Sequence, residues 1–149
     1  MKAIIHPSQS PAHVEAERAE CLRQKNIASK FLYETPRQAE LWLKLQQQFA
    51  PPTDLAQPYQ QAAKALATQW PRRNGTLIAL GCGGGKKDLT ILKALPQCTR
   101  FVPTDVSEPL AVKAAEAVPG STPLVFDLAT AKDLPSFLNE HAGPNCIFT

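Results

Sequence analysis

A glycine-rich turn and a later aspartate are the residues whose types and spacing most clearly point to chemistry. Gly81, Gly83 and Gly85 follow the apolar run 76–80 and precede a helical pattern. Glycines let a backbone approach a ligand closely, and the helix that follows presents free N–H groups to it. Asp105 ends a second apolar run roughly 20 residues further on, where a carboxylate can accept hydrogen bonds from two ribose hydroxyls. The pattern predicts a site for a nucleotide-like ligand.

The glycine spacing separates three kinds of nucleotide site. A dinucleotide fingerprint, G-x-G-x-x-G, would need a glycine where Lys86 stands. A P-loop would need a glycine at Leu80 and a hydroxyl at Lys87. The remaining spacing, G-x-G-x-G, resembles the first motif of class I S-adenosylmethionine (SAM) methyltransferases. The alternative is a turn that only joins a strand to a helix.

Further charged residues near this turn bear on the ligand. Asp127 ends the apolar run 124–126, where its carboxylate could accept from an adenine amino group or simply face solvent in a turn. Lys86 and Lys87 lie in the first turn of the predicted helix, where positive charge opposes the helix dipole. An anion beside one of them would be the carboxylate of SAM or a pyrophosphate, and a solvated lysine pair is the alternative.

No catalytic triad or metal cluster can be assembled from the sequence. The four cysteines contain no C-x-x-C pair and the three histidines are scattered, so we expect no metal site. A cofactor that carries the reactive group requires only orientation and electrostatics from the protein. The expected reaction is in-line attack by an unprotonated nucleophile on a methyl carbon, and the catalytic residues are left unknown.

The elements that must position these residues alternate between strands and helices after residue 73. This alternation predicts an α/β fold with a Rossmann-like parallel sheet. Pro103 predicts an irregularity or a position near the end of its strand. Ser107 is expected to cap one helix, and Thr130 with Asp133 to start another. The predicted strands are 76–80, 100–106, 124–126 and 145–149, with helices near 89–95, 108–118 and 130–138 between them.

Residues 1–72 are expected to form a helical segment that precedes the sheet domain of residues 73–149. The clearest helix start is Thr35-Pro36-Arg37-Gln38, which combines a capping hydroxyl, a proline at N1 and a capping-box glutamine. Tyr33 could line a pocket. The predicted helices are 12–31, 36–49 and 58–70, and Ala39, Trp42, Leu45 and Phe49 recur at helical spacing in the second. Trp42 and Trp70 are expected to pack in the core, with a ligand platform as the alternative.

The composition argues against several classes of function. The net charge is only +3 and no basic stripe is interleaved with aromatic residues, so we expect no nucleic-acid binding. No apolar run approaches the roughly 18 residues of a membrane span, and the first residues do not form a signal peptide. We therefore expect a cytoplasmic protein with reduced cysteines.

Residues 76–149 resemble the histidine-specific Nα-methyltransferase family, the SAM enzymes of ergothioneine biosynthesis and their relatives. The similar stretches are Leu80-Gly81-Cys82-Gly83, followed by Lys87, and the run F-V-P-T-D-V-S at 101–107. The phrase F-V-P-x-D-V-S is the most specific of these. The sequence departs from the family at Ala79, where an acidic residue is usual, and after Tyr33, where a glycine is usual.

The resemblance implies N-methylation of a small amino-acid-like substrate with SAM as the cofactor. It implies a seven-stranded sheet, of which this chain supplies the first four strands, with N-terminal helices over the cofactor. Tyr33 would be a substrate contact. The resemblance also implies the residues that bind the cofactor. The glycine turn (Gly81, Gly83 and Gly85) and Lys87 would lie near the methionine part of SAM, Asp105 would bind the ribose, and Asp127 would lie near the adenine.

Two other readings stay open at this point. The first is a Rossmann protein that binds NAD or a nucleotide sugar. The second is a truncated, non-catalytic interaction module that self-associates through an open sheet edge. The chain stops within the apolar run 145–149, so we expect it to be the N-terminal part of a larger protein.

Overall fold

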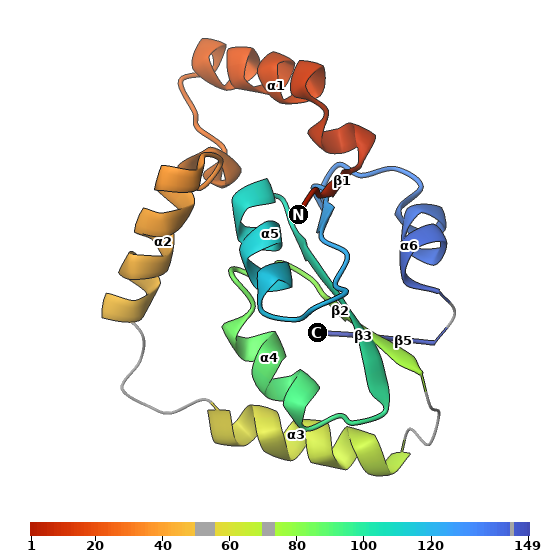
Figure 1. The fold of residues 1–149 in the computed structure, drawn as a ribbon. Coiled ribbons are helices and arrows are strands. Elements are labelled where there is room, and N and C mark those ends of the chain that lie inside the picture. The colour runs from red at the N-terminus through yellow and green to blue at the C-terminus, as the bar shows by residue number, and fades with distance from the viewer. Residues whose placement is uncertain (50–55, 70–73, 144) are drawn as a thin grey trace.

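The computed structural model describes residues 1–49, 56–69, 74–143 and 145–149, and Figure 1 shows their arrangement. Five parallel strands form one sheet in the order β1-β4-β3-β2-β5, which confirms the predicted Rossmann-like α/β class. The strands are β1 (Ile4–Ile5), β2 (Gly75–Ala79), β3 (Cys98–Asp105), β4 (Leu124–Val125) and β5 (Cys146–Phe148). The α-helices are α1 (Pro11–Arg23), α2 (Pro36–Gln48), α3 (Ala56–Gln69), α4 (Lys86–Lys93), α5 (Glu108–Glu116) and α6 (Leu134–Ala142), with 3-10 turns η1 (Pro7–Gln9) and η2 (Ser29–Leu32).

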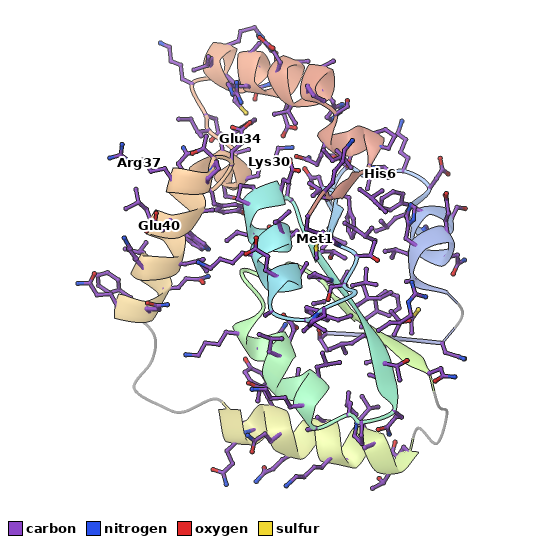
Figure 2. The ribbon with its side chains drawn as sticks, in the orientation of Figure 1. Met1, His6, Lys30, Glu34, Arg37 and Glu40 are labelled. Atoms are coloured by element: carbon purple, nitrogen blue, oxygen red, sulfur yellow. The ribbon has the colours of Figure 1, made fainter. Side chains whose placement is uncertain are left out.

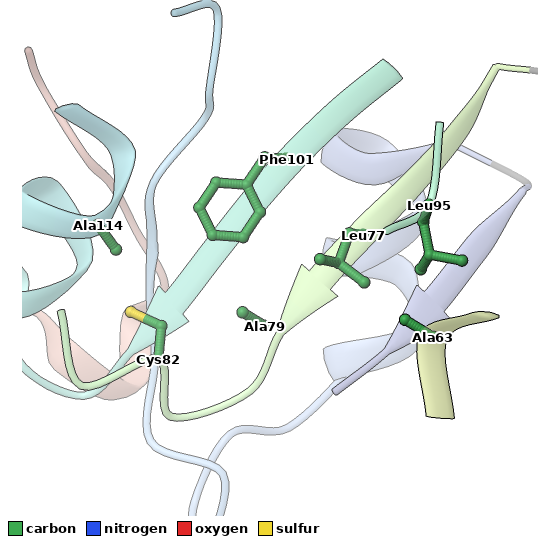
Figure 3. Close-up of a cluster of buried hydrophobic side chains, with 7 residues drawn as sticks. All are labelled: Ala63, Leu77, Ala79, Cys82, Leu95, Phe101 and Ala114. Carbon is green, nitrogen blue, oxygen red and sulfur yellow. The ribbon is translucent and has the colours of Figure 1, made fainter. Parts of the chain in front are cut away.

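The two faces of the sheet are covered by different helices. Leu77 and Phe101 point to one face, where they pack with Ala63 of α3 and Ala114 of α5 (Figure 3). Ile91 and Leu92 of α4 pack against the same cluster. Their neighbours Ile78 and Val102 point to the opposite face, where α6 covers them. This alternation follows from the two-residue period of a strand. Because both faces are buried, β2 reads as a continuous apolar run rather than an alternating one.

The strand β1 corrects the prediction that residues 1–72 are helical and that the chain supplies four strands. Ile4 and Ile5 pair in parallel with Leu124 and Val125 of β4. The backbone N–H of His6 continues this ladder by donating to the Val125 carbonyl at 2.9 Å. A two-residue strand is too short to show an alternating pattern in the sequence, so β1 is recognised only from its pairing with β4. The predicted domain boundary at residue 73 stays a prediction.

The N-terminal helices differ from their predicted extents. The helix predicted over 12–31 ends at Arg23, because Lys25 adopts a positive φ of 53° that no helix continues through. The capping box of Thr35 and Gln38 is confirmed. Trp70 lies outside the described residues.

The residues that recur at helical spacing in α2 are only partly buried. Ala39 is buried, but Leu45 and Phe49 are 48% and 73% exposed. The helix lies beside α5 through Ala39 and its neighbours, which turns the Leu45–Phe49 side outward. Trp42 is half-buried and lines a cavity instead of filling the core.

One predicted helix start is wrong and one is confirmed without its predicted cap. The helix α6 begins at Leu134 with Asp133 itself at the N-cap, in a left-handed conformation and without a side-chain cap, so the Thr130 start is wrong. The helix α5 begins at Glu108 with Ser107 at the N-cap position, as predicted, but the Ser107 hydroxyl donates to the Tyr33 carbonyl and not to the helix backbone. Pro103 lies in β3, two residues before its end. Within the described ranges, no helix is long and apolar enough to cross a membrane.

Candidate functional site

A cavity of about 380 Å³ lies where three neighbouring strands end. Because β2, β3 and β4 are parallel, their carboxyl ends meet at one edge of the sheet. The chain then crosses back to place β5 on the other side of β2, and open α/β sheets bind ligands at such a reversal. The cavity is lined by Tyr33, Trp42, Gln46, Gly81, Gly83, Thr104, Asp105, Val106, Leu110, Phe126, Asp127, Leu128 and Ala129.

The glycine turn after β2 gives the cavity its backbone wall. Gly81 and Gly83 have φ values of +60° and +53°, which favour glycine, and both line the cavity. A Cβ built on Gly81 would have no described heavy atom within 4 Å, so its backbone faces open space. The turn can therefore approach a ligand closely.

Gly85 has a different environment. It is the N-cap of α4, with φ +82°, and a Cβ there would lie 2.9 Å from the Ala114 Cβ of α5. Glycine is therefore required for the packing of α4 against α5. Gly85 is not among the residues that line the cavity, and its role toward a cofactor stays a prediction.

Asp105 is held in place at the end of β3. Its Oδ2 accepts from the Gly83 backbone N–H at 2.9 Å, and its Oδ1 accepts from the Ser107 N–H at 3.0 Å. Burial raises the pKa of this carboxyl, and the two backbone N–H donors oppose that rise. The bonds leave part of the acceptor capacity of the two oxygens for a ligand in the cavity. Asp105 is thus joined to the glycine turn, as the sequence spacing predicts.

Cys82, between the two cavity glycines, is a packing residue. Its Sγ lies 3.9 Å from the Asp105 Oδ2 and 3.9 Å from the Leu110 carbonyl oxygen. Burial and the Asp105 charge raise its pKa to about 12. The thiol is therefore protonated at neutral pH and does not act as a nucleophile.

Asp127, at the end of β4, is bound by a lysine that the sequence reasoning missed. The Lys30 Nζ lies 2.9 Å from the Asp127 Oδ2 and also contacts Glu17 of α1. Lys30 is only 8% exposed. Desolvation raises the pKa of Asp127, but the Lys30 hydrogen bond and charge outweigh it and hold that pKa below its usual value. No local pattern marks Lys30, because its partners lie far away in the sequence.

Residues between α1 and the middle of α2 form the other wall of the cavity. The rings of Tyr33 and Trp42 lie 5.4 Å apart, centroid to centroid. The Ser107 hydroxyl donates to the Tyr33 carbonyl and joins this wall to the end of β3. The structure thus brings Tyr33 together with Gly81, Gly83, Asp105 and Asp127 around one cavity.

The charged residues at the start of α4 lie away from the cavity lining. The Lys87 Nζ is 3.4 Å from the Asp88 Oδ1, and Lys87 does not line the cavity, so its role toward a cofactor stays a prediction. Asp88 is fully buried; its Oδ1 accepts from the Thr149 hydroxyl at 2.7 Å, whereas its Oδ2 has no hydrogen-bond partner among the described residues. Ala79 is fully buried in the apolar cluster of Figure 3.

Comparisons with known proteins bear on this site. No curated protein matches the chain. Among solved structures, the crystal structure of Streptomyces venezuelae DesVI matches with 20% sequence identity and a TM-score of 0.35. That match covers 50% of this chain and 32% of the DesVI chain, so the chain spans about a third of that structure.

A family model extends the comparison over most of the chain. The model of the histidine-specific, SAM-dependent methyltransferases matches residues 14–144, which include the N-terminal helices as well as the sheet. It confirms the resemblance carried by the glycine turn and the 101–107 run, and it makes SAM the expected cofactor. The chain therefore belongs to the histidine-specific, SAM-dependent methyltransferase family.

Proposed function

We propose that this chain is the cofactor-binding portion of a SAM-dependent methyltransferase that methylates a nitrogen of a small, amino-acid-like substrate. The observation that carries the proposal is one cavity that joins a glycine turn to two strand-end carboxylates and an aromatic wall. Family membership supports SAM over a dinucleotide. The cavity volume also falls within the roughly 300–1,000 Å³ typical of small-molecule sites.

The residues at the cavity suit the parts of SAM. The open backbone at Gly81 suits the close approach of the methionine part, and Asp105 is placed to accept from ribose hydroxyls. Asp127 is ionised and lines the cavity, so it suits the exocyclic amino group of adenine. Lys87 would contribute a positive charge toward the methionine carboxylate.

When bound, SAM supplies a methyl group activated by its sulfonium. The chain's own residues then bind and orient: Asp105 fixes the ribose position, and the wall of Tyr33 and Trp42 limits access of water. Tyr33 is the proposed substrate contact, because its ring belongs to the same cavity as the two carboxylates. A thiol as strongly protonated as Cys82 supplies no base, so we assign no catalytic residue within this chain.

Location and association belong to the same proposal. All four cysteines are free thiols, which supports a cytoplasmic location. The strand β5 lies at one edge of the described sheet, and its Phe148 is 53% exposed. Self-association through this edge is the second reading of the sequence that stays open, and sedimentation velocity over a concentration series tests it.

The test is a calorimetric titration of the natural protein that carries this chain with S-adenosylhomocysteine, and with NAD as a control ligand. We expect saturable binding of S-adenosylhomocysteine, no binding of NAD, and at least a tenfold loss of affinity in Asp105→Asn, because hydrogen bonds to charged groups contribute about 1.5–3 kcal/mol. Asp133→Asn is the matched control, since Asp133 is exposed and its side chain caps nothing. Binding of NAD alone would refute the proposal.

A further inference from the structure

We propose that Lys30 is a positioning residue that makes the cavity select a purine with a 6-amino group over one with a 6-oxo group, by holding Asp127 in place as an acceptor. This inference rests on the proposed function, because it concerns the base of the cofactor. Lys30 stands in η2, just before α2, at the junction between the N-terminal helices (Figure 2).

Lys30 is buried between two carboxylates. Its side chain is 9% exposed, and those of Glu17 and Asp127 are 27% and 16% exposed. Desolvation alone would lower the pKa of Lys30, but hydrogen bonds and charges from Glu17 and Asp127 outweigh it and raise that pKa. The ammonium therefore stays charged at neutral pH, and so does Asp127.

The contacts of Asp127 leave room for one more donor. A carboxylate has about four acceptor sites. Lys30 uses one on Oδ2, and the Ala129 N–H uses one on Oδ1 at 2.9 Å. An ionised carboxylate only accepts, so its remaining acceptor capacity favours an amino group and repels a carbonyl oxygen.

The backbone of Asp127 is held separately. Its N–H donates to the Ser8 hydroxyl at 3.2 Å, and the His6 ring contacts both that hydroxyl and the Lys132 carbonyl. Because these bonds come from the residues after β1, the main chain at the end of β4 does not depend on Lys30. Removing Lys30 therefore frees mainly the side chain of Asp127.

The experiment compares two ligands that differ only at the purine 6-position, S-adenosylhomocysteine and S-inosylhomocysteine, by calorimetry on the natural protein that carries this chain. We expect the unaltered protein to prefer the 6-amino ligand by roughly tenfold, the value of one hydrogen bond to a charged group. Lys30→Met should reduce the preference to within about twofold. Lys30→Arg should retain it, because the charge and donors remain.

Two controls separate positioning from simple docking of α1. Glu17→Gln removes the negative charge from the contact to α1 but leaves the Lys30–Asp127 pair, so the preference should persist. Lys132→Met makes the same chemical change on an exposed neighbour and should change nothing. Lys30→Gln replaces Lys30→Met if circular dichroism shows that the methionine variant is unfolded.

The outcomes are distinct. If Lys30→Met weakens both ligands equally, or Glu17→Gln lowers the preference as much as Lys30→Met does, Lys30 has only a structural role and the inference is wrong. If the unaltered protein binds both ligands equally, the inference fails while the proposed function stands. If it binds neither, both fail.

Discussion

The central strands and helix α1 are held to the molecule by different forces. Leu77 and Ile78 of β2 are fully buried, one on each face of the sheet. The structure describes every residue of α1, and none of them is buried. The helix is tied instead by ion pairs from Glu17 to Lys30 and from Arg18 to Glu34. Burial of apolar surface is strong and is not screened by salt, whereas the Arg18–Glu34 pair is largely exposed, weak and screened, and the part-buried Glu17–Lys30 pair is screened less.

The cavity lies where these two regions meet, so its two walls differ in character. The strand-end wall, with Gly81 and Asp105, rests on the buried sheet. The other wall, with Tyr33 and Trp42, follows α1 and η2. We infer that the strand-end wall keeps its geometry under conditions that loosen the aromatic wall. The following predictions test this contrast.

The largest effect is expected in the sheet. Leu77→Ala should lower the free energy of unfolding by about 3 kcal/mol, because it removes buried methyl groups and leaves a cavity. Leu22→Ala in α1 is the matched control, since Leu22 is 67% exposed, and should change the stability by less than about 0.5 kcal/mol. Urea unfolding followed by circular dichroism measures both. Similar losses in the two variants would contradict the contrast.

The packing of α4 against α5 should give the next largest effect. Gly85→Ala places a Cβ 2.9 Å from the Ala114 Cβ in a backbone with φ +82°, so we expect a loss of about 2–3 kcal/mol. Gly120→Ala is the control, because Gly120 has φ +80° but no described heavy atom within 4 Å of the new Cβ. It should lose only the conformational cost, about 1 kcal/mol. Equal losses in chemical denaturation would show that packing at Gly85 is unimportant.

The two carboxylates should respond to pH with opposite signs. Burial raises the pKa of Asp105, so the folded protein binds a proton more readily than the unfolded chain and its relative stability rises as the pH falls through that pKa. The lowered pKa of Asp127 has the reverse effect: its contribution is present above the ordinary value of 3.8 and is lost as the pH falls through the folded pKa.

Urea unfolding between pH 7 and pH 3 checks these signs against Asp105→Asn and Asp127→Asn. On acidification, the free energy of unfolding of the unaltered protein should fall relative to that of Asp127→Asn. Relative to that of Asp105→Asn, it should rise. If the stability difference from the unaltered protein changed with pH in the same direction for both variants, the opposite pKa directions of Asp105 and Asp127 would be refuted.

The smallest effect concerns the docking of α1. Raising the salt concentration from 0.05 M to 0.5 M should weaken mainly the Arg18–Glu34 pair, and the part-buried Glu17–Lys30 pair less, and destabilise the docking of the helix by less than about 1 kcal/mol. Hydrogen exchange should then speed up at the amides of α1 and stay unchanged in β2. Faster exchange in both elements would mean that α1 and the sheet open as one unit.

Sequence reasoning located the strand-end residues better than the N-terminal wall. The glycine turn and Asp105 could be predicted because the ends of adjacent parallel strands share one edge, so spacing along the chain fixes proximity. Lys30 could not, because its contact with Asp127 depends on how η2 folds over the sheet. Helical periodicity predicts Trp42 in the core, whereas it lines the cavity, because periodicity shows which face of a helix is apolar but not what covers that face.

The pairing of β1 has a consequence for the order in which the chain acquires structure. Ile4 pairs with Leu124, so about 120 residues must be made before this contact can form. During synthesis, residues 4–9 leave the ribosome before β4 and cannot pair until β4 has been made, whereas β2 and β3 pair over a much shorter separation. The hydrogen bond between the Asp127 N–H and the Ser8 hydroxyl cannot form until then either. The end of the cavity at Asp127 is therefore completed late, by residues that are synthesised long before the strand with which they pair.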